Sequence, residues 1–328
     1  MKRILITGAS GFIGGFLVEE ALRRDWEVTA AVRPTSDRIW LQDARIRFLE
    51  LNFRSEGDLQ EKLKTAGRFD FVIHNAGSTA QPNREGYFAA NFENTKRFVE
   101  ALQGNQQTPD KFLYVSSLAA IGPTKYDQIL KPEQAPNPVT FYGESKLAAE
   151  QYLASLNDFP WNAVRPTAVF GPRERGLFLA IKLAAQGWGF LLGNKPQRLS
   201  FIYVKDLVRL MFAALEYGHS GKRYLVTDGK TYANTDLGKS VETVTGKRTV
   251  QLKIPIPIVR TVAGISEMAG RIRGEMPPLN REKLPELMAE SWLCDMTETF
   301  EDLKFQPQYD LYSGMEETVQ WYKSNRWL

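Results

Sequence analysis

The segment Thr7–Gly14, with the sequence TGASGFIG, is the feature that most restricts the fold of this chain. It lies between a short apolar strand expected at residues 3–7 and an amphipathic helix expected at 12–24. An ordinary tight turn explains one or two of its glycines. Three glycines in this register let a diphosphate approach main-chain N–H groups at a helix N-terminus. The segment therefore predicts dinucleotide binding through Gly8, Ser10, Gly11, Phe12, Ile13 and Gly14.

Strands and helices continue to alternate beyond this turn. Apolar runs predict strands at 27–32, 47–51, 70–74, 111–116 and 161–165, separated by helices at 58–66, 89–102 and 142–156. This alternation is typical of βαβ units, so we expect an α/β fold with a doubly wound parallel sheet (Rossmann fold).

A smaller, mostly helical part should follow the sheet. We expect a nucleotide-binding domain at 1–170, joined by the returning segment 201–228, a substrate-binding domain at 171–200 and 229–311, and a C-terminal helix at 312–328. Within the second domain the pattern predicts helices at 177–186, 235–245 and 258–273 and a loop at 187–193.

Composition limits the partners. The net charge is +4 and the basic residues are scattered, which gives no reason to expect nucleic acid. The single cysteine, Cys294, fits a reducing compartment and is expected to be a small apolar residue. No stretch reaches the roughly 18 uninterrupted apolar residues of a membrane span. We therefore expect a cytoplasmic protein with no nucleic acid, membrane or metal partner.

Tyr142 and Lys146 are four residues apart and share one face of the predicted helix. A lysine ammonium there is expected to lower the pKa of the tyrosine hydroxyl, so that Tyr142 exchanges a proton near neutral pH. The pattern is weak alone, but the glycine turn and the serine pair Ser116-Ser117 precede it. Together they predict a hydride-transfer enzyme.

The end of the second strand favours one cofactor. Arg33 lies at this position, with Ser36 and Arg38 after it. A guanidinium suits the 2′-phosphate of NADP, whereas an acidic residue would bind the ribose 2′-hydroxyl of NAD. Asp37 is the one nearby carboxylate, and Arg33 could also simply point into solvent. We predict NADP, with NAD less favoured.

The chain resembles the extended short-chain dehydrogenase/reductases, which include NAD(P)-dependent epimerases and dehydratases of nucleotide sugars and NADP-linked ketone reductases. The resemblance covers nearly the whole chain and rests on 7–14, 74–77, 114–117, 142–146, 165–166, 170–172 and 203–206. It implies that Ser117 is the catalytic serine, Tyr142 the general acid/base, and Lys146 the residue that lowers its pKa and holds the nicotinamide ribose. It also implies that Asn91 fixes a helix near the site, and that the cofactor contacts Arg33, Arg38, Asn52, Asn75, Ala76, Gly77, Tyr142, Lys146 and Pro166.

Two positions at which the chain departs from the family's motifs indicate which kind of substrate it takes. Ser117-Leu118-Ala119 stands where the family's dehydratases have Thr-Asp-Glu, and Ile121 precedes Gly122 where epimerases usually have Tyr. The segment is closest to the hydroxysteroid- and dihydroflavonol-type reductases. We therefore expect an NADP-dependent oxidoreductase that interconverts a secondary alcohol and a carbonyl. The alternatives are a nucleotide-sugar epimerase with retained NAD(P) and a non-catalytic NADP-binding scaffold or redox sensor. The resemblance also allows a homodimer.

Residues of the second domain bear on the substrate. An apolar pocket would favour a hydrophobic carbonyl compound, although the same side chains could instead be that domain's core. Arg198 lies one residue from a position where sugar-nucleotide enzymes often place a phosphate-binding arginine, which keeps the epimerase alternative open. The apolar candidates are Phe178, Trp188, Phe190, Leu191, Leu192, Tyr203 and Met276.

Overall fold

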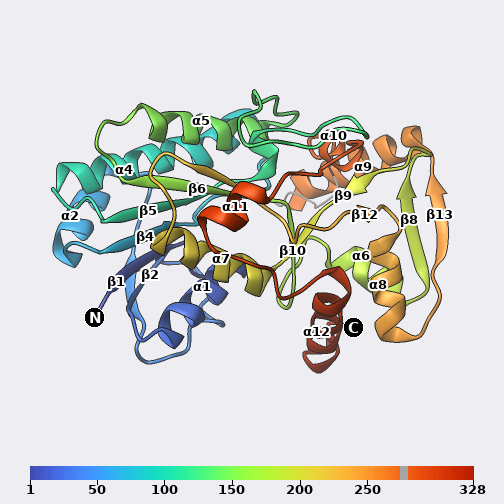
Figure 1. Cartoon of the computed structure of the whole chain (residues 1–328), viewed down its shortest axis with the longest axis horizontal. Helices are drawn as coiled ribbons and strands as arrows, with labels where there is room; N and C mark the ends of the chain where they lie inside the picture. Colours follow the sequence, from blue (N-terminus) through green and yellow to red (C-terminus); the bar gives the residue numbers. More distant parts are fainter. Residues whose placement is uncertain (274–279) are drawn as a thin grey trace.

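The computed structural model describes residues 1–273 and 280–328, and its centre is a parallel sheet of seven strands (Figure 1). The strands are β1 (Arg3–Thr7), β2 (Glu27–Val32), β3 (Arg47–Glu50), β4 (Phe71–His74), β5 (Lys111–Val115), β6 (Trp161–Pro166) and β11 (Arg223–Val226). Their order is β11-β6-β5-β4-β1-β2-β3, so the winding direction reverses between β1 and β4. Dinucleotides bind at such a switch point in doubly wound sheets.

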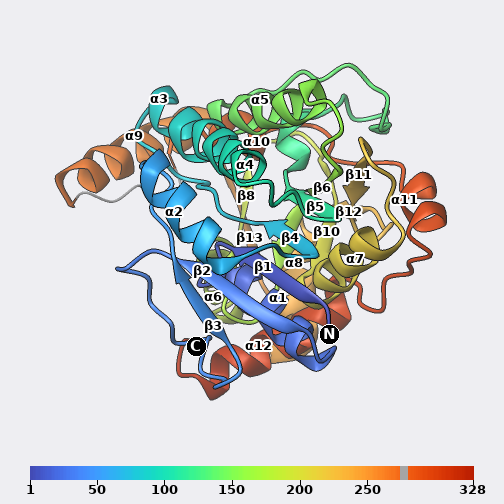
Figure 2. The ribbon, with the colours of Figure 1, turned by 90° about the vertical axis from the view of Figure 1, so that its left-hand side faces the viewer.

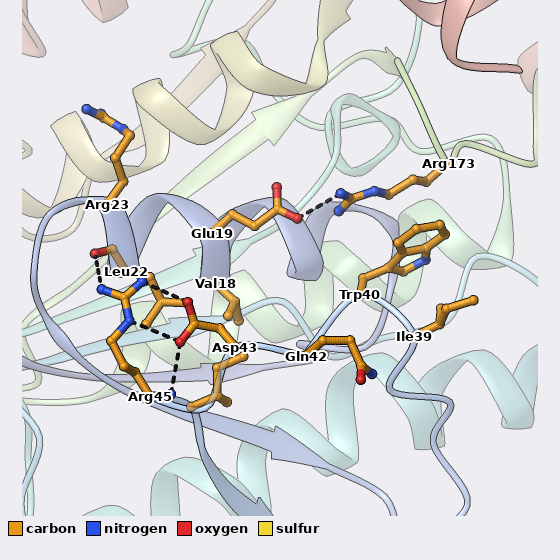
Figure 3. Close-up of a pocket in the computed structure, with 11 residues that line it drawn as sticks. Val18, Glu19, Leu22, Arg23, Ile39, Trp40, Gln42, Asp43, Arg45 and Arg173 are labelled. Carbon is orange, nitrogen blue, oxygen red and sulfur yellow. Dashed lines mark hydrogen bonds and ion pairs between the residues drawn. The ribbon is translucent and has the colours of Figure 1, made fainter. Parts of the chain in front are cut away.

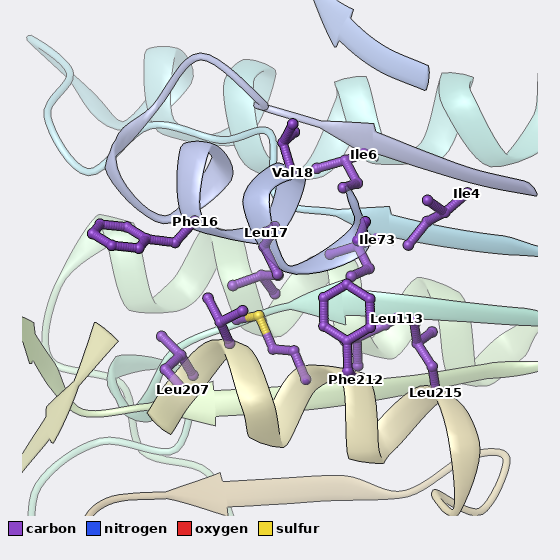
Figure 4. Packing of buried hydrophobic residues seen from close by; sticks show 14 of the residues in the cluster. Ile4, Ile6, Phe16, Leu17, Val18, Ile73, Leu113, Leu207, Phe212 and Leu215 are labelled. Carbon is purple, nitrogen blue, oxygen red and sulfur yellow. The ribbon is translucent and has the colours of Figure 1, made fainter. Parts of the chain in front are cut away.

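Helices cover both faces of the sheet, as Figure 2 shows. One face packs against α1 (Phe12–Arg23) and α7 (Val204–Glu216), and the other against α2 (Glu56–Ala66), α4 (Asn94–Gly104) and α5 (Phe141–Ser155). Alternate residues of β1 serve the two layers, since Ile4 and Ile6 face α1 while Leu5 faces the opposite core (Figure 4). The predicted fold class is confirmed.

The accessory elements lie beside the carboxyl ends of the strands (Figure 1). We use this name for α6 (Phe178–Ala185), β8 (Trp188–Leu192), α8 (Asp236–Thr245), β13 (Val250–Ile254), α9 (Ile256–Arg273) and α10 (Leu284–Leu287). The last helix, α12 (Leu311–Ser324), packs against α8 and shares a core with α6. The returning segment supplies α7 and the edge strand β11, while the domain boundaries stay a prediction.

Short elements complete the described chain. Two small strand pairs join β7 (Ala168–Phe170) with β10 (Phe201–Tyr203) and β9 (Arg198–Leu199) with β12 (Tyr232–Ala233). The short helices are α3 (Arg84–Phe88) and α11 (Thr297–Asp302), with a π-helical turn at Ala89–Glu93 and a 3-10 turn at Leu118–Ala120. Within residues 1–273 and 280–328, no helix has the length and apolar character needed to cross a membrane.

The predicted loop at 187–193 is wrong. Trp188–Leu192 is strand β8, and it pairs in parallel with β13, which was not expected as a strand. The glycines and aromatic residues here suggested a loop, but a short strand can take its hydrogen bonds from a partner about sixty residues away. Met276 lies outside the described residues.

A buried ion pair joins α5 to the sheet. The Glu150 side chain of α5 is fully buried, and the Arg165 side chain of β6 is 2% exposed. Arg165 donates from Nε and Nη2 to the two carboxylate oxygens of Glu150, at 3.0 and 2.6 Å. Glu150 also accepts hydrogen bonds from Ser116 Oγ at 2.5 Å and Arg223 Nε at 3.2 Å. One carboxylate therefore connects α5 with the carboxyl ends of β5 and β6 and with the first residue of β11.

We predict that Glu150→Gln strongly destabilises the fold. The substitution keeps the shape but leaves the Arg165 guanidinium buried without its counterion, which costs about 3–5 kcal/mol in the free energy of unfolding. Urea unfolding monitored by tryptophan fluorescence measures the loss. Glu100→Gln on the exposed side of α4 is the matched control and should change the free energy by less than about 0.5 kcal/mol. Equal stabilities of the two variants would contradict the prediction.

Candidate active site

The glycine turn can hold a diphosphate. Gly8 has a φ of +65°, and a Cβ there would come within 2.8 Å of the Asn75 main chain. A Cβ at Gly14 would lie 2.1 Å from the Gly8 carbonyl oxygen. Gly11 is exposed and precedes α1 without a side-chain cap, which leaves the first N–H groups of the helix open to an anion. Ser10, Phe12 and Ile13 are partly exposed around this turn.

The end of β4 lies against the glycine turn. Asn75 Nδ2 donates to the Gly8 carbonyl at 3.3 Å, and the Ala76 N–H donates to Thr7 Oγ1 at 3.0 Å. A Cβ on Gly77 would come within 2.7 Å of Asn91 Oδ1 and 3.1 Å of Lys146 Nζ. The absence of a side chain at Gly77 therefore lets α5 and the π-helical turn approach this strand end.

His74 is a buried residue of β4 that contacts Thr7, the first residue of the glycine-turn segment. Its Nδ1 lies 2.9 Å from Thr7 Oγ1 and its Nε2 lies 3.0 Å from Thr95 Oγ1, inside a stack with Phe98 and Tyr114. Burial lowers the pKa of His74 to about 3, with a smaller contribution from the Lys146 charge. A buried neutral imidazole with two hydroxyl partners is a structural histidine, as expected. His219 is exposed, also as expected.

Tyr142 enters the site in the first turn of α5. Thr140 caps this helix by accepting from the Gly143 N–H at 3.1 Å. A Cβ on Gly143 would lie 2.3 Å from the Ala119 carbonyl oxygen, so glycine lets α5 contact the turn that follows Ser117. The Ser117 side chain lies near the Tyr142 hydroxyl and acts to lower the pKa of that hydroxyl. Ser117 Oγ also accepts from the Ala119 N–H at 3.1 Å.

Lys146 lies deeper on the same helix. Its Nζ donates to the Val115 carbonyl at 2.8 Å and lies 4.9 Å from the centre of the Tyr114 ring. Burial lowers the pKa of Lys146 to about 8, and Glu150 opposes this shift. Since Gly77 is adjacent, the structure brings Lys146 to the same strand end as Asn91.

The predicted effect of Lys146 on Tyr142 is wrong for this structure. Burial raises the pKa of Tyr142 well above its ordinary value; Ser117 opposes the shift and the nearby Glu286 carboxylate adds to it. Spacing along a helix fixed the shared face, but it gave no information on how much water surrounds the hydroxyl.

Asn91 connects two parts of the site. It lies in the π-helical turn at 89–93, where its Oδ1 accepts from the Ser78 N–H at 2.7 Å. Its Nδ2 donates to the Ser78 carbonyl at 3.0 Å and to Ser145 Oγ at 2.9 Å. The fully buried Asn91 thus ties the loop after β4 to the Tyr142 helix.

Sequence reasoning missed two carboxylates that border Tyr142. Glu282 accepts from the Tyr142 N–H at 3.2 Å and from the Tyr87 hydroxyl at 3.3 Å. Glu286, on α10, accepts from Thr140 Oγ1 at 2.5 Å, and burial raises the pKa of its carboxyl. Both residues lie about 140 positions after Tyr142 in the chain, so no local sequence pattern predicts that they lie close to it in space.

The remaining predicted cofactor residues occupy different settings. Arg33 is exposed, and its side chain has no ion-pair partner among the residues that the structure describes. Arg38 pairs with Glu50 at 2.6 Å and stacks over the Phe48 ring. Asn52 is exposed, and its Oδ1 accepts from the Arg54 N–H at 3.1 Å. Pro166 is buried at the end of β6.

The aromatic residues expected near the substrate do not gather in one pocket. Phe178 packs edge-on against Tyr322 and Trp327, and Tyr203 is fully buried in the same core. Trp188 and Phe190 are 47% and 42% exposed. Phe178 and Tyr203 therefore belong to the core of the second domain, which was the alternative to a substrate pocket. Trp188 and Phe190 line neither a pocket nor a core. Arg198 stacks over the ring of Tyr126 at 4.7 Å.

A pocket lies beside the C-terminal half of α1 (Figure 3). The Arg173 guanidinium lies between the Phe16 and Trp40 rings there and pairs with Glu19 at 2.7 Å. None of the predicted catalytic residues lines this pocket, so it is separate from the candidate site. Its lining comprises Val18, Glu19, Leu22, Arg23, Ile39, Trp40, Gln42, Asp43, Arg45, Ile46 and Arg173.

A glycine turn at the switch point of a doubly wound parallel sheet defines a dinucleotide-binding protein of the Rossmann class. Residues 4–227 match the NAD dependent epimerase/dehydratase family, and the chain belongs to this family. It is thus an NAD(P)-dependent enzyme with an oxidoreductase or epimerase activity.

Three comparisons illustrate the range of similar proteins. The chain is 24% identical to the decarboxylating sterol-4-alpha-carboxylate 3-dehydrogenase of Candida albicans, covering 98% of this chain and 97% of that protein. It is 25% identical to the UDP-glucose 4-epimerase of Vibrio cholerae, over 97% and 95% of the two chains. The structure of the Thermotoga maritima UDP-glucose 4-epimerase with UDP-glucose superposes with a TM-score of 0.81 at 19% identity, covering 98% and 99%.

We predict that His74 makes the fold sensitive to acid. Its folded-state pKa of about 3 lies below the unfolded value of about 6.5, so the unfolded chain binds the proton first. Stability should therefore fall as the pH drops below about 6.5, by up to about 1.4 kcal/mol per pH unit. Urea unfolding across this range measures the slope. His74→Gln removes the proton-binding group and should flatten the slope, whereas His219→Gln, at the exposed histidine, should leave it unchanged. Equal slopes for both variants would exclude this role.

Proposed function

We propose that this protein is an NADP-dependent oxidoreductase that interconverts a secondary alcohol and a carbonyl by hydride transfer. The observation that carries the proposal is the convergence at the ends of β4 and β5. The Ser117 side chain lies near the Tyr142 hydroxyl there, and Lys146 Nζ lies beside Gly77 and Asn91. Strand β4 pairs with β1, which precedes the glycine turn, and β5 pairs with β4. These groups therefore lie at the same carboxyl-terminal end of the sheet as the glycine turn.

The side chains divide the chemistry between them. The bound nicotinamide supplies or accepts the hydride. Ser117 donates a hydrogen bond to the substrate oxygen, and Tyr142 gives that oxygen a proton or takes one from it. Lys146, whose pKa is about 8, retains most of its charge near neutral pH and contributes a positive potential to this strand end. Asn91 acts through Ser145 and the Ser78 loop to hold α5 in position.

The cofactor preference rests on Arg33. An exposed guanidinium at the tip of β2, without an ion-pair partner in the described ranges, fits the 2′-phosphate of NADP. Asp37, the one nearby carboxylate that would favour NAD, uses Oδ1 in a local turn, where it accepts from the Ile39 N–H at 3.0 Å. Arg38 is already paired with Glu50 and contributes less to this argument.

The substrate class is supported by the comparisons and by two positions in the sequence. A sterol dehydrogenase matches over nearly the whole chain, and Ser117-Leu118-Ala119 lacks the carboxylates of a dehydratase. An apolar alcohol or ketone is therefore our first candidate. The similarity to a UDP-glucose 4-epimerase keeps epimerisation of a nucleotide sugar as the second. A non-catalytic scaffold is not retained, because the family consists of enzymes.

Tyr142→Phe tests the chemistry. Removing the hydroxyl that exchanges the proton should lower kcat by about 10²- to 10⁴-fold and leave the Kd for NADPH nearly unchanged. NADPH oxidation with a panel of apolar ketones measures the first quantity, and fluorescence titration the second. Tyr217→Phe, at an exposed tyrosine, is the control and should retain full activity. Turnover of a nucleotide sugar without net consumption of NADPH would favour the epimerase instead.

Arg33→Ala tests the cofactor preference. The loss of a charge-assisted hydrogen bond of about 1.5–3 kcal/mol should raise the Kd for NADPH by roughly 10- to 150-fold, with little change for NADH. Isothermal titration with each cofactor measures both constants. Arg68→Ala, at the opposite end of the sheet where Arg68 bonds Asp110, should affect neither. Equal weakening of both cofactors would remove the 2′-phosphate argument.

A further inference from the structure

The accessory elements carry an exposed apolar surface. Strands β8 and β13 pair in register, with Trp188 opposite Val250 and Phe190 opposite Leu252, so these four side chains share one face. On α9, four apolar residues recur at the spacing of one helical stripe. All eight side chains are between 41% and 63% exposed. We call this surface the docking face: Trp188, Phe190, Val250, Leu252, Ile258, Val262, Ile265 and Met268.

The two parts of the docking face adjoin each other. Leu192 and Ile254 end the two strands on the same side as Trp188 and Val250, and they pack against Val259 and Ala263 on the buried side of α9. Helix α9 thus crosses the end of this small sheet. Figure 1 shows it directly beside β8 and β13, and in Figure 2 it extends outward from the body of the molecule.

The charge of β13 and α9 indicates which kind of partner binds the docking face. Residues 242–268, which include β13 and the exposed stripe of α9, contain four basic residues and two acidic ones, Glu242 and Glu267. All four basic residues are exposed: Lys247, Arg248, Lys253 and Arg260. A second copy of the chain on a self-complementary interface would bring two such basic surfaces together, which is unfavourable. An exposed apolar surface on segments with a net excess of lysine and arginine instead fits the boundary of an anionic lipid bilayer.

We propose that the docking face binds peripherally to anionic lipid membranes. The absence of a spanning segment led the sequence to predict no membrane partner, but exposed apolar side chains on a folded surface serve attachment without spanning. Apolar residues become a surface feature only through the tertiary structure. From the sequence, Trp188 and Phe190 were expected in a pocket or in the core of the second domain.

The position of the docking face links it to the candidate site. The buried side of α9 packs against Leu284 of α10. On the same helix, Glu286 bonds Thr140, the cap of the Tyr142 helix. Bilayer contact at α9 is therefore one short helix away from Tyr142. A protein bound to the bilayer through α9 could take a lipid alcohol or ketone from the membrane as its substrate. This link to the substrate rests on the proposed function.

Vesicle cosedimentation of the full chain tests the docking. The protein should pellet with vesicles of equal parts phosphatidylglycerol and phosphatidylcholine, remain in solution with phosphatidylcholine alone, and be released by high salt. Val262→Asp combined with Ile265→Asp should reduce the bound fraction at least tenfold. Lys253→Glu combined with Arg260→Glu should weaken binding by roughly fivefold or more per residue. Tyr217→Asp, at an exposed aromatic residue on the α7 end, is the control and should bind normally.

Several results would overturn the inference. These are no binding to anionic vesicles, equal binding by the parent and the α9 variants, or a lipid-independent dimer that the α9 variants dissociate. Circular dichroism and NADPH affinity verify that each variant is folded. A parent protein that turns over its substrate with NADPH but does not bind anionic vesicles rejects this inference alone. Vesicle binding by a protein that turns over no carbonyl compound rejects the proposed function alone.

Discussion

The buried Glu150–Arg165 pair is the interaction on which the geometry of the site depends. Glu150 lies two turns after Tyr142 and one turn after Lys146 on α5. Its carboxylate is held by groups at the carboxyl ends of β5 and β6 and by the first residue of β11. A charge with this many fixed partners has one low-energy position, because moving it would leave buried donors unsatisfied. The rotation and depth of α5 follow from that position. So does the placement of Tyr142 against Ser117.

Close packing of the backbone sets the second constraint. Gly8 against Asn75, Gly77 against Asn91 and Gly143 against Ala119 are contacts that any Cβ would obstruct. Each lies where one segment of the site meets another: the cofactor turn with β4, β4 with the π-helical turn, and α5 with the Ser117 turn. In the glycine turn, the absence of side chains also leaves main-chain N–H groups at the start of α1 open to a diphosphate. Fold and cofactor site therefore share one requirement for small residues.

The parts that sequence reasoning predicted are those set by local pattern. The glycine turn, the alternation of strands and helices, and the shared face of Tyr142 and Lys146 all depend on spacings of a few residues. Pairing of β8 with β13 and the approach of Glu286 to Thr140 depend on contacts about 60 and 146 residues apart, which no local period encodes. The direction of the Tyr142 pKa shift was missed for a related reason. Desolvation is a property of the assembled site and not of the helix.

The raised pKa of Tyr142 bears on the protonation state of the site. Burial keeps the phenol protonated near neutral pH, and Glu286 reinforces that state from the accessory side. A protonated tyrosine beside Ser117 is ready to donate to a carbonyl oxygen, as ketone reduction requires. The described site therefore holds its hydroxyl in the protonated form, in which it can serve as the proton donor.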